Sequence, residues 1–149
     1  MRLYTLHTRQ KLPVSLNEAW AFFSDPSNLN AITPENLKFQ TLSGDDRKMF
    51  SGQIIHYKIS PFRGIQRQWV TAIPPMEPNA FFVDEQRFGP YKFWHHKHFF
   101  REIDGGIEME DLFGCIRNLL HPLLVRPKLK AIFDYRKNKL KQLFGRYPG

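Results

Sequence analysis

The chain has 149 residues, of which 42% are hydrophobic, so it can bury a core as one domain over residues 1–149 without covalent staples. Its single cysteine, Cys115, excludes an internal disulfide, and no apolar run approaches the ~20 residues that a membrane-spanning helix needs. No signal-like hydrophobic segment follows Met1, so we expect a cytoplasmic protein, and the net charge of +8 at pH 7 raises the question of acidic partners.

The N-terminal part of the sequence predicts a strand followed by two short helices. Polar and apolar residues alternate over residues 2–12, which is the period of a half-buried strand. Ser15 and Glu18 have the spacing of a capping box, in which each side chain bonds the other residue's backbone amide, so a helix should follow. That helix should stop before Asp25, which precedes a proline, and residues 27–32 should form a second short helix.

Six further strands are expected in the middle of the chain. Each is a run rich in β-branched and aromatic residues, and turn-forming residues such as Gly89-Pro90 and Asp104-Gly105-Gly106 separate the runs. The six expected strands are residues 37–42, 49–59, 65–73, 80–88, 91–103 and 107–115.

The C-terminal segment predicts one long helix with an apolar stripe. A regular helix is expected over residues 126–144, with Pro127 tolerable in its first turn, and residues 119–125 are a preceding turn or a kinked extension. The stripe consists of Val125, Leu129, Ile132, Phe133, Leu140, Leu143 and Phe144. The sequence therefore predicts an α+β fold: a curved seven-stranded antiparallel sheet wrapped around a long C-terminal helix, with two short helices after the first strand.

The most informative segment is residues 84–100, where two expected strands meet at a tight turn. With a strand period of two, alternate side chains point to opposite faces of the second strand. One face carries Trp94, His96, His98 and Phe100, and the other carries Phe93, His95, Lys97 and Phe99. An indole, two imidazoles and a phenyl on one face are typical of the wall of a mostly apolar cavity that needs a few hydrogen-bonding groups.

Several motifs, in this order of elements, carry a family resemblance over essentially the whole chain. They are Trp20-Ala21-Phe22-Phe23-Ser24-Asp25-Pro26, Asp84-x-Gln86, Gly89-Pro90-Tyr91, Trp94-x-His96-x-His98-x-Phe100, Asp111 and Ile132-Phe133-Asp134-Tyr135-Arg136. The chain resembles the helix-grip fold of the START/Bet v1-like superfamily (SRPBCC), and more narrowly its bacterial polyketide cyclase/dehydrase-like group. The resemblance implies a hydrophobic cavity between sheet and helix that binds lipids, hormones or polyketide-like molecules, with no cofactor and no metal.

We therefore predict a carrier or sensor that binds a small hydrophobic molecule in this cavity. The expected ligand-binding residues are Asp84, Gln86, Trp94, His96, His98, Phe100, Asp111, Phe113, Phe133 and Arg136. The alternative is a cyclase or dehydratase acting in the same cavity, with His96, His98 and Asp84 as proton carriers. No nucleophile motif or phosphate-binding loop accompanies these residues, which argues against nucleophilic catalysis and phosphate binding and leaves acid–base catalysis open beside binding.

Arg136 lies in the apolar stripe of the last helix, where a guanidinium must be paired or must reach water through the cavity. We expect it to be largely buried and to form a structural pair with Asp111 or Asp84. The alternative is that Arg136 meets an anionic group of a ligand inside the cavity.

Two histidines at i and i+2 on one strand face, here His96 and His98, could also coordinate a metal ion, with Asp84 or Asp111 as the third ligand. No other ligand pair in the sequence has a supporting spacing. We therefore expect these imidazoles to bond neighbouring carboxylates or to line the cavity without a metal.

Most of the net charge lies at the C-terminus. Residues 126–149 hold eight basic residues against one acidic residue, which supplies +7 of the +8. Lys130, Lys137 and Lys141 lie opposite the apolar stripe and should be exposed. Without any nucleic-acid-reading motif, we expect no specific nucleic-acid binding and at most a weak association with acidic surfaces. A basic module that docks on an acidic partner or membrane is the third alternative.

Overall fold

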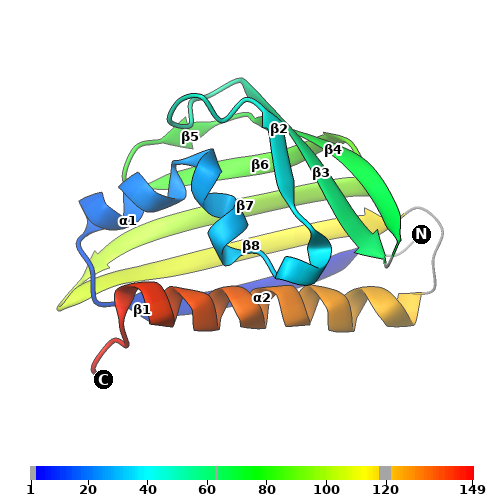
Figure 1. Ribbon diagram of the computed structural model, residues 1–149. Coiled ribbons are helices and arrows are strands. Elements are labelled where there is room, and N and C mark those ends of the chain that lie inside the picture. Colours follow the sequence, from blue (N-terminus) through cyan, green and yellow to red (C-terminus); the bar gives the residue numbers. More distant parts are fainter. Residues whose placement is uncertain (1–2, 63, 118–121) are drawn as a thin grey trace.

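The computed structural model describes residues 3–62, 64–117 and 122–149 and contains one curved sheet with helices on one side (Figure 1). In chain order the elements are β1 (Tyr4–Leu12), α1 (Leu16–Phe23), the 3-10 helices η1 (Pro26–Ile32) and η2 (Glu35–Leu37), β2 (Gln40–Ser43), β3 (Gln53–Phe62), β4 (Ile65–Ile73), β5 (Met76–Glu77), β6 (Phe81–Phe88), β7 (Tyr91–Ile103), β8 (Gly106–Arg117) and α2 (Pro122–Phe144).

All strand pairs are antiparallel, in the order β1-β8-β7-β6-β4-β3-β2, and β5 adds to β6 off this path. Figure 1 shows α2 running along the sheet beside β1, with α1 and η1 lying in front of the same face of the sheet. In agreement, α2 contacts β1 and η1, and α1 contacts β7, β8 and η1. This is the predicted helix-grip arrangement, in which strands and helices enclose a common interior.

The first turn after β1 folds as its residues predict. Ser15 is the N-cap of α1: its hydroxyl accepts from the Glu18 amide at 3.2 Å, and the Glu18 carboxylate accepts from the Ser15 amide at 3.0 Å. Asp25 then caps η1 by accepting from the Ser27 amide at 3.1 Å. These local bonds fix α1 and η1 against the sheet and so shape the interior beneath them.

The strand boundaries differ from expectation in the region around β2. Residues 35–37 form η2, and Lys38 then adopts a left-handed conformation with φ 46°, so β2 starts at Gln40. Strand β5 was not predicted because its two residues lie within a proline-rich turn and pair only with β6. Eight strands are thus present among the described residues where seven were expected, and β4 and β7 have the predicted bounds.

Helix α2 begins earlier than predicted. Since it starts at Pro122, Pro127 lies inside the helix, where it removes one main-chain hydrogen bond. The expected extension over residues 119–125 lies in part outside the described residues. Leu140 is 1% exposed, but Leu143, in the last turn of the helix, is 47% exposed. The prediction that Leu143 belongs to the buried stripe was wrong.

Candidate ligand-binding cavity

A cavity of about 140 Å³ lies between the inner face of the sheet, η1 and α2. Its lining is mainly apolar and aromatic, with a few polar groups gathered on β6, β7 and α2. The lining includes Leu29 and Ile32 from η1, Tyr57 and Ile59 from β3, Trp69, Thr71 and Ile73 from β4, Phe82 and Asp84 from β6, Trp94, His96 and His98 from β7, and Val125, Lys128, Ile132 and Arg136 from α2. Such a lining is typical of sites for small organic molecules.

The inner face of β7 is the face that the alternation predicted. His96 and His98 are buried there and Trp94 is half-buried. On the outer face, His95 pairs with Glu85 at 2.7 Å and is only partly exposed. The strand period therefore places an indole and two imidazoles in the interior, where their polar atoms must find partners.

Those partners form a group of four residues on three neighbouring strands, which we call the His–Asp tetrad: Asp84, which is half-buried, and His96, His98 and Asp111, which are buried. His98 lies between the two carboxylates, with Nε2 2.9 Å from Asp84 Oδ2 and Nδ1 2.9 Å from Asp111 Oδ1. His96 bonds Asp111 Oδ1 through Nε2 at 2.9 Å, and its Nδ1 is 3.7 Å from Asp84 Oδ2. The strand register brings them together, since Asp84 is opposite His96 and Asp111 is opposite His98.

The geometry fixes the protonation of the tetrad. An ionised carboxylate only accepts hydrogen bonds, so both ring nitrogens of His98 must donate, which makes His98 an imidazolium. His96 donates through Nε2 to Asp111, and its Nδ1 keeps a lone pair.

The pKa shifts agree with this assignment. Burial and the charge of His98 lower the pKa of His96 to about 4. Burial opposes the charge on His98 as well, but its hydrogen bonds to Asp111 and Asp84 outweigh burial and raise the pKa of His98. Burial would raise the pKa of both carboxyls. The hydrogen bond from His98 nevertheless lowers the pKa of Asp84, and the bonds from His96 and His98 hold that of Asp111 well below its usual range. With both carboxylates ionised, His98 protonated and His96 neutral, the arrangement that these hydrogen bonds require, the tetrad carries one net negative charge.

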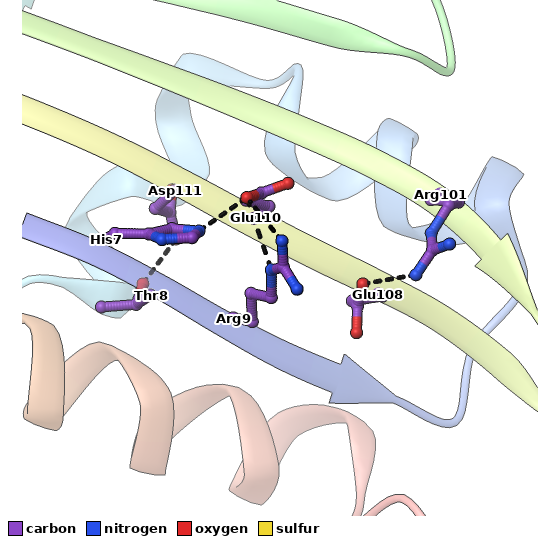
Figure 2. A network of polar contacts seen from close by, with 7 residues as sticks. All are labelled: His7, Thr8, Arg9, Arg101, Glu108, Glu110 and Asp111. Atoms are coloured by element: carbon purple, nitrogen blue, oxygen red, sulfur yellow. Dashed lines mark hydrogen bonds and ion pairs between the residues drawn. The ribbon is translucent and has the colours of Figure 1, made fainter.

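Neighbouring side chains occupy the other carboxylate oxygens. Trp94 Nε1 donates to Asp84 Oδ1 at 2.9 Å. Figure 2 shows the second such bond, from Thr8 Oγ1 on β1 to Asp111 Oδ2 at 3.5 Å. The ring of Phe82 stacks on His98 with centroids 4.2 Å apart. Contacts from Trp94, Thr8 and Phe82 thus fix the positions of the tetrad side chains.

Figure 2 also shows the polar contacts made by the next residues on β1 and β8. His7 and Arg9 both bond Glu110, at 2.6 and 3.2 Å, and Arg101 on β7 bonds Glu108 at 2.6 Å. Of these, His7, Arg9 and Arg101 are exposed, so this network contributes little stability and is distinct from the buried tetrad.

Arg136 does not form the predicted pair. The two carboxylates proposed as its partners, Asp111 and Asp84, are bonded to the imidazoles instead. Its guanidinium carbon lies 5.4 Å from the centroid of the Phe133 ring, and its Nε atom is buried without a hydrogen-bond partner. Arg136 lines the cavity, so its charge faces the space that a ligand would enter.

Five of the ten predicted site residues line the cavity and five do not. Gln86 exchanges hydrogen bonds with the backbone of Tyr91 and so closes the β6–β7 turn. Phe100 is packed in the core against Trp20 and Phe23. The other three lie just behind the lining: Asp111 in the tetrad, and Phe113 and Phe133 against the ring of His96 at 5.6 and 5.4 Å.

The sequence reasoning missed the part of the cavity built by β3 and β4. Tyr57 on β3 and Trp69 and Thr71 on β4 line the cavity. A period of two would have indicated Tyr57, because it is two residues from both Ile55 and Ile59 and so shares their apolar face of β3. Burial raises the pKa of Tyr57, so its hydroxyl stays neutral and can donate or accept within the cavity.

One atom each of Asp84, His96 and His98 lie within 4.8 Å of one another, a spacing that a metal ion could bridge. Within the tetrad, His98 Nε2 and Asp84 Oδ2 are already bonded to each other. The expectation that no metal binds here stays a prediction.

The basic residues of α2 are arranged largely as expected. Lys130 and Lys137 are exposed, Lys141 is half-buried, and Lys130 pairs with Asp134 at 2.6 Å. The prediction of weak, non-specific attraction to acidic surfaces is not tested by this arrangement. Among the described residues, no helix has the length and apolar character needed to cross a bilayer.

No protein-family model matches the chain, and no curated protein matches it in sequence. Solved structures do match over nearly its full length. Protein CV1439 from Chromobacterium violaceum has a TM-score of 0.74 at 13% identity, covering 97% of this chain and 99% of that chain. The Zhui aromatase/cyclase from a Streptomyces species has a TM-score of 0.70 at 11% identity, covering 95% and 93%. Ara h 8.0201, a Bet v 1 allergen, has a TM-score of 0.63 at 12% identity, covering 95% and 99%. These likenesses confirm the fold predicted from the sequence, the helix-grip fold of SRPBCC (START/Bet v1-like) proteins.

Proposed function

We propose that this protein binds a small hydrophobic molecule in the cavity between the sheet and α2, as a carrier or sensor. The observation that carries the proposal is the combination of a mainly apolar interior space with one rigid polar wall, the His–Asp tetrad. Apolar surface supplies affinity on burial, and a few fixed polar groups supply orientation.

The size of the cavity favours a ligand built on a ring. An engineered cavity of about 150 Å³ holds one benzene molecule, so about 140 Å³ suits a group of similar size. The rings of Trp69 and Trp94 meet edge to face, 4.6 Å apart, and Tyr57 lies 6.4 Å from Trp69. Aromatic walls of this kind favour an aromatic guest, which gains both buried area and ring–ring contacts.

A second candidate is an enzyme that works on such a molecule, and the protonation of the tetrad favours it. His96 Nδ1 keeps a lone pair that can accept a proton, while His98 beside it carries one. Two neighbouring groups in opposite protonation states are the requirement for acid–base chemistry such as cyclisation or dehydration.

Two measurements test the binding proposal. Native mass spectrometry of the protein purified from its own host should detect a co-purifying small molecule. In vitro, Trp94→Ala should weaken the uptake of an apolar fluorescent probe about tenfold, because it removes an aromatic wall of the cavity. Lys97→Ala, on the other face of the same strand, is the control and should leave uptake unchanged. Equal uptake by both variants contradicts a site at this wall.

Turnover distinguishes the second candidate. If the co-purified compound is converted on incubation with fresh protein, His96→Gln should abolish conversion while keeping the compound bound. If the unmodified protein binds the compound without converting it, the enzyme candidate is wrong and the carrier or sensor function is supported.

A further inference from the structure

We infer that the ligand is an apolar carboxylic acid, whose carboxylate is held by Arg136 inside the cavity. This inference rests on the proposed function and adds to it the chemical class of the molecule. The observation behind it is that Arg136, which lines the cavity, makes no hydrogen bond or ion pair with any described residue.

A guanidinium in this position needs an acceptor. The Nε–H of Arg136 is closed off from solvent and unbonded, which is costly for a charged donor, and the contact with Phe133 satisfies only the face of the guanidinium. The two carboxylates expected to pair with Arg136 are bonded within the tetrad instead. Asp84 receives bonds from Trp94 and His98, and Asp111 receives bonds from Thr8, His96 and His98.

The charges around the cavity also favour an anion. Lys128, two turns before Arg136 on α2, lines the same space and donates to the Pro61 carbonyl at 2.7 Å. Asp25, the other acidic residue of the lining, is bonded to Ser27 and Lys48. The lining thus contains two cations of α2, and one of them, Arg136, has no hydrogen-bond or ion-pair partner among the described residues.

A second unbonded donor belongs to another residue of the same lining. Trp69 lines the cavity, and its Nε1–H is buried without a partner. A neutral apolar guest would leave both the Trp69 and the Arg136 donors unsatisfied, whereas an acid with its two carboxylate oxygens brings acceptors into the cavity. Arginine binds carboxylates through two parallel N–H bonds, which fixes the orientation of the guest.

The test compares acids with neutral molecules of the same shape. Benzoate and 2-naphthoate are titrated against benzamide and 2-naphthamide at pH 8, with binding followed by calorimetry and tryptophan fluorescence. We expect the acid of each pair to bind about tenfold more tightly or better, as for a hydrogen bond to a charged group. Arg136→Met should reduce this preference to near one, and Lys137→Met, an exposed cation on the same helix, should retain it.

The outcomes separate this inference from the proposed function. If acid and amide bind equally well, the protein binds ring compounds but Arg136 does not select acids, and the inference is wrong. If the preference survives in Arg136→Met, the inference is also wrong. If none of the four molecules binds, the proposed function fails for ring-sized ligands, and the inference fails with it. Circular dichroism of each variant confirms that the fold is intact, and Arg136→Lys, which keeps the charge but not the planar fork, should retain part of the preference.

Discussion

The rings of His96 and His98 lie with their centroids 3.7 Å apart, yet one imidazole is neutral and the other is positively charged. His98 donates to two carboxylates, whereas His96 donates to one and is kept neutral by burial and by the charge of its neighbour. Each ring therefore depends on the state of the other, and a change at either one alters the whole tetrad.

This difference predicts a specific pH dependence of stability. The pKa of His96 is about 6.5 in the unfolded chain and about 4 in the folded protein, so between these values only the unfolded chain binds the proton. The free energy of unfolding should therefore decrease as the pH is lowered from about 6.5 to about 4. The pKa of His98 is raised, so its contribution is complete below about pH 6.5 and is lost as pH rises through its folded pKa. Asp84 and Asp111, with lowered pKa values, add a further loss at more acidic pH.

Urea unfolding from pH 3 to pH 10 measures this profile, and imidazole ¹⁵N shifts report each ring. At pH 7 we expect His98 with two protonated nitrogens and His96 with one. His96→Gln should remove the decline between pH 6.5 and pH 4. Two imidazoles that titrate alike near the ordinary value would contradict the assignment.

A double-mutant cycle on His98 and Asp111 tests their coupling. His98→Phe leaves two buried carboxylates without their imidazolium, and Asp111→Asn leaves the imidazolium with one, so each should cost about 3 kcal/mol or more. The double variant should cost less than the sum by about 1.5 kcal/mol. Lys130 and Asp134, an exposed pair on α2, are the control and should couple by about 0.5 kcal/mol or less. Additive losses at His98 and Asp111 would show that the two do not interact.

Arg136→Met should stabilise the ligand-free protein by about 1 kcal/mol, because it removes an unbonded, buried donor. This is the opposite of the effect expected for an arginine in a structural ion pair, whose removal is costly. Thermal unfolding of the ligand-free protein measures the change. A loss of about 3 kcal/mol would mean that Arg136 has a structural partner after all.

The tetrad should not bind a transition metal tightly at pH 7. A metal would have to displace the proton on His98 Nε2, which is held by Asp84, and would break the hydrogen bonds that compensate the buried charges. Stoichiometric Co²⁺ should therefore give no tetrahedral absorption spectrum. Such a spectrum, lost again in His98→Phe, would establish a metal site at these residues.

The sequence predicted the local pattern of the site well and its long-range partners less well. Alternation along one strand was enough to place Trp94, His96 and His98 inside, because the period of a strand is a local property. It could not say that Asp84 and Asp111 both lie beside the imidazoles, since this depends on the register of β6 and β8 against β7. Arg136 was assigned the partner that a guanidinium prefers, but the carboxylates were already taken by histidines on adjacent strands.

For the fold as well, elements marked by a local sequence pattern were predicted, and an element that depends on a distant partner was not. Helix α1, with its capping box, and strands β4 and β7 follow from short-range patterns. Strand β5 exists only because β6 is beside it, so no local signal marks it.

The placement of the tetrad on three adjacent strands has a consequence for how the chain finds its native alignment. The inner face of β8 has apolar residues on both sides of Asp111, namely Met109 and Phe113, so a shift of two residues would keep the hydrophobic pattern intact. The shift that places Asp111 opposite Phe100 would move it away from His98 and bury a carboxylate without its imidazolium, at a cost of several kcal/mol. A misaligned pairing of β7 and β8 can thus bury the same apolar residues as the native pairing and still be less stable, because it leaves a buried charge unpaired. The four polar residues therefore select one strand register during folding, whatever they later do for a ligand.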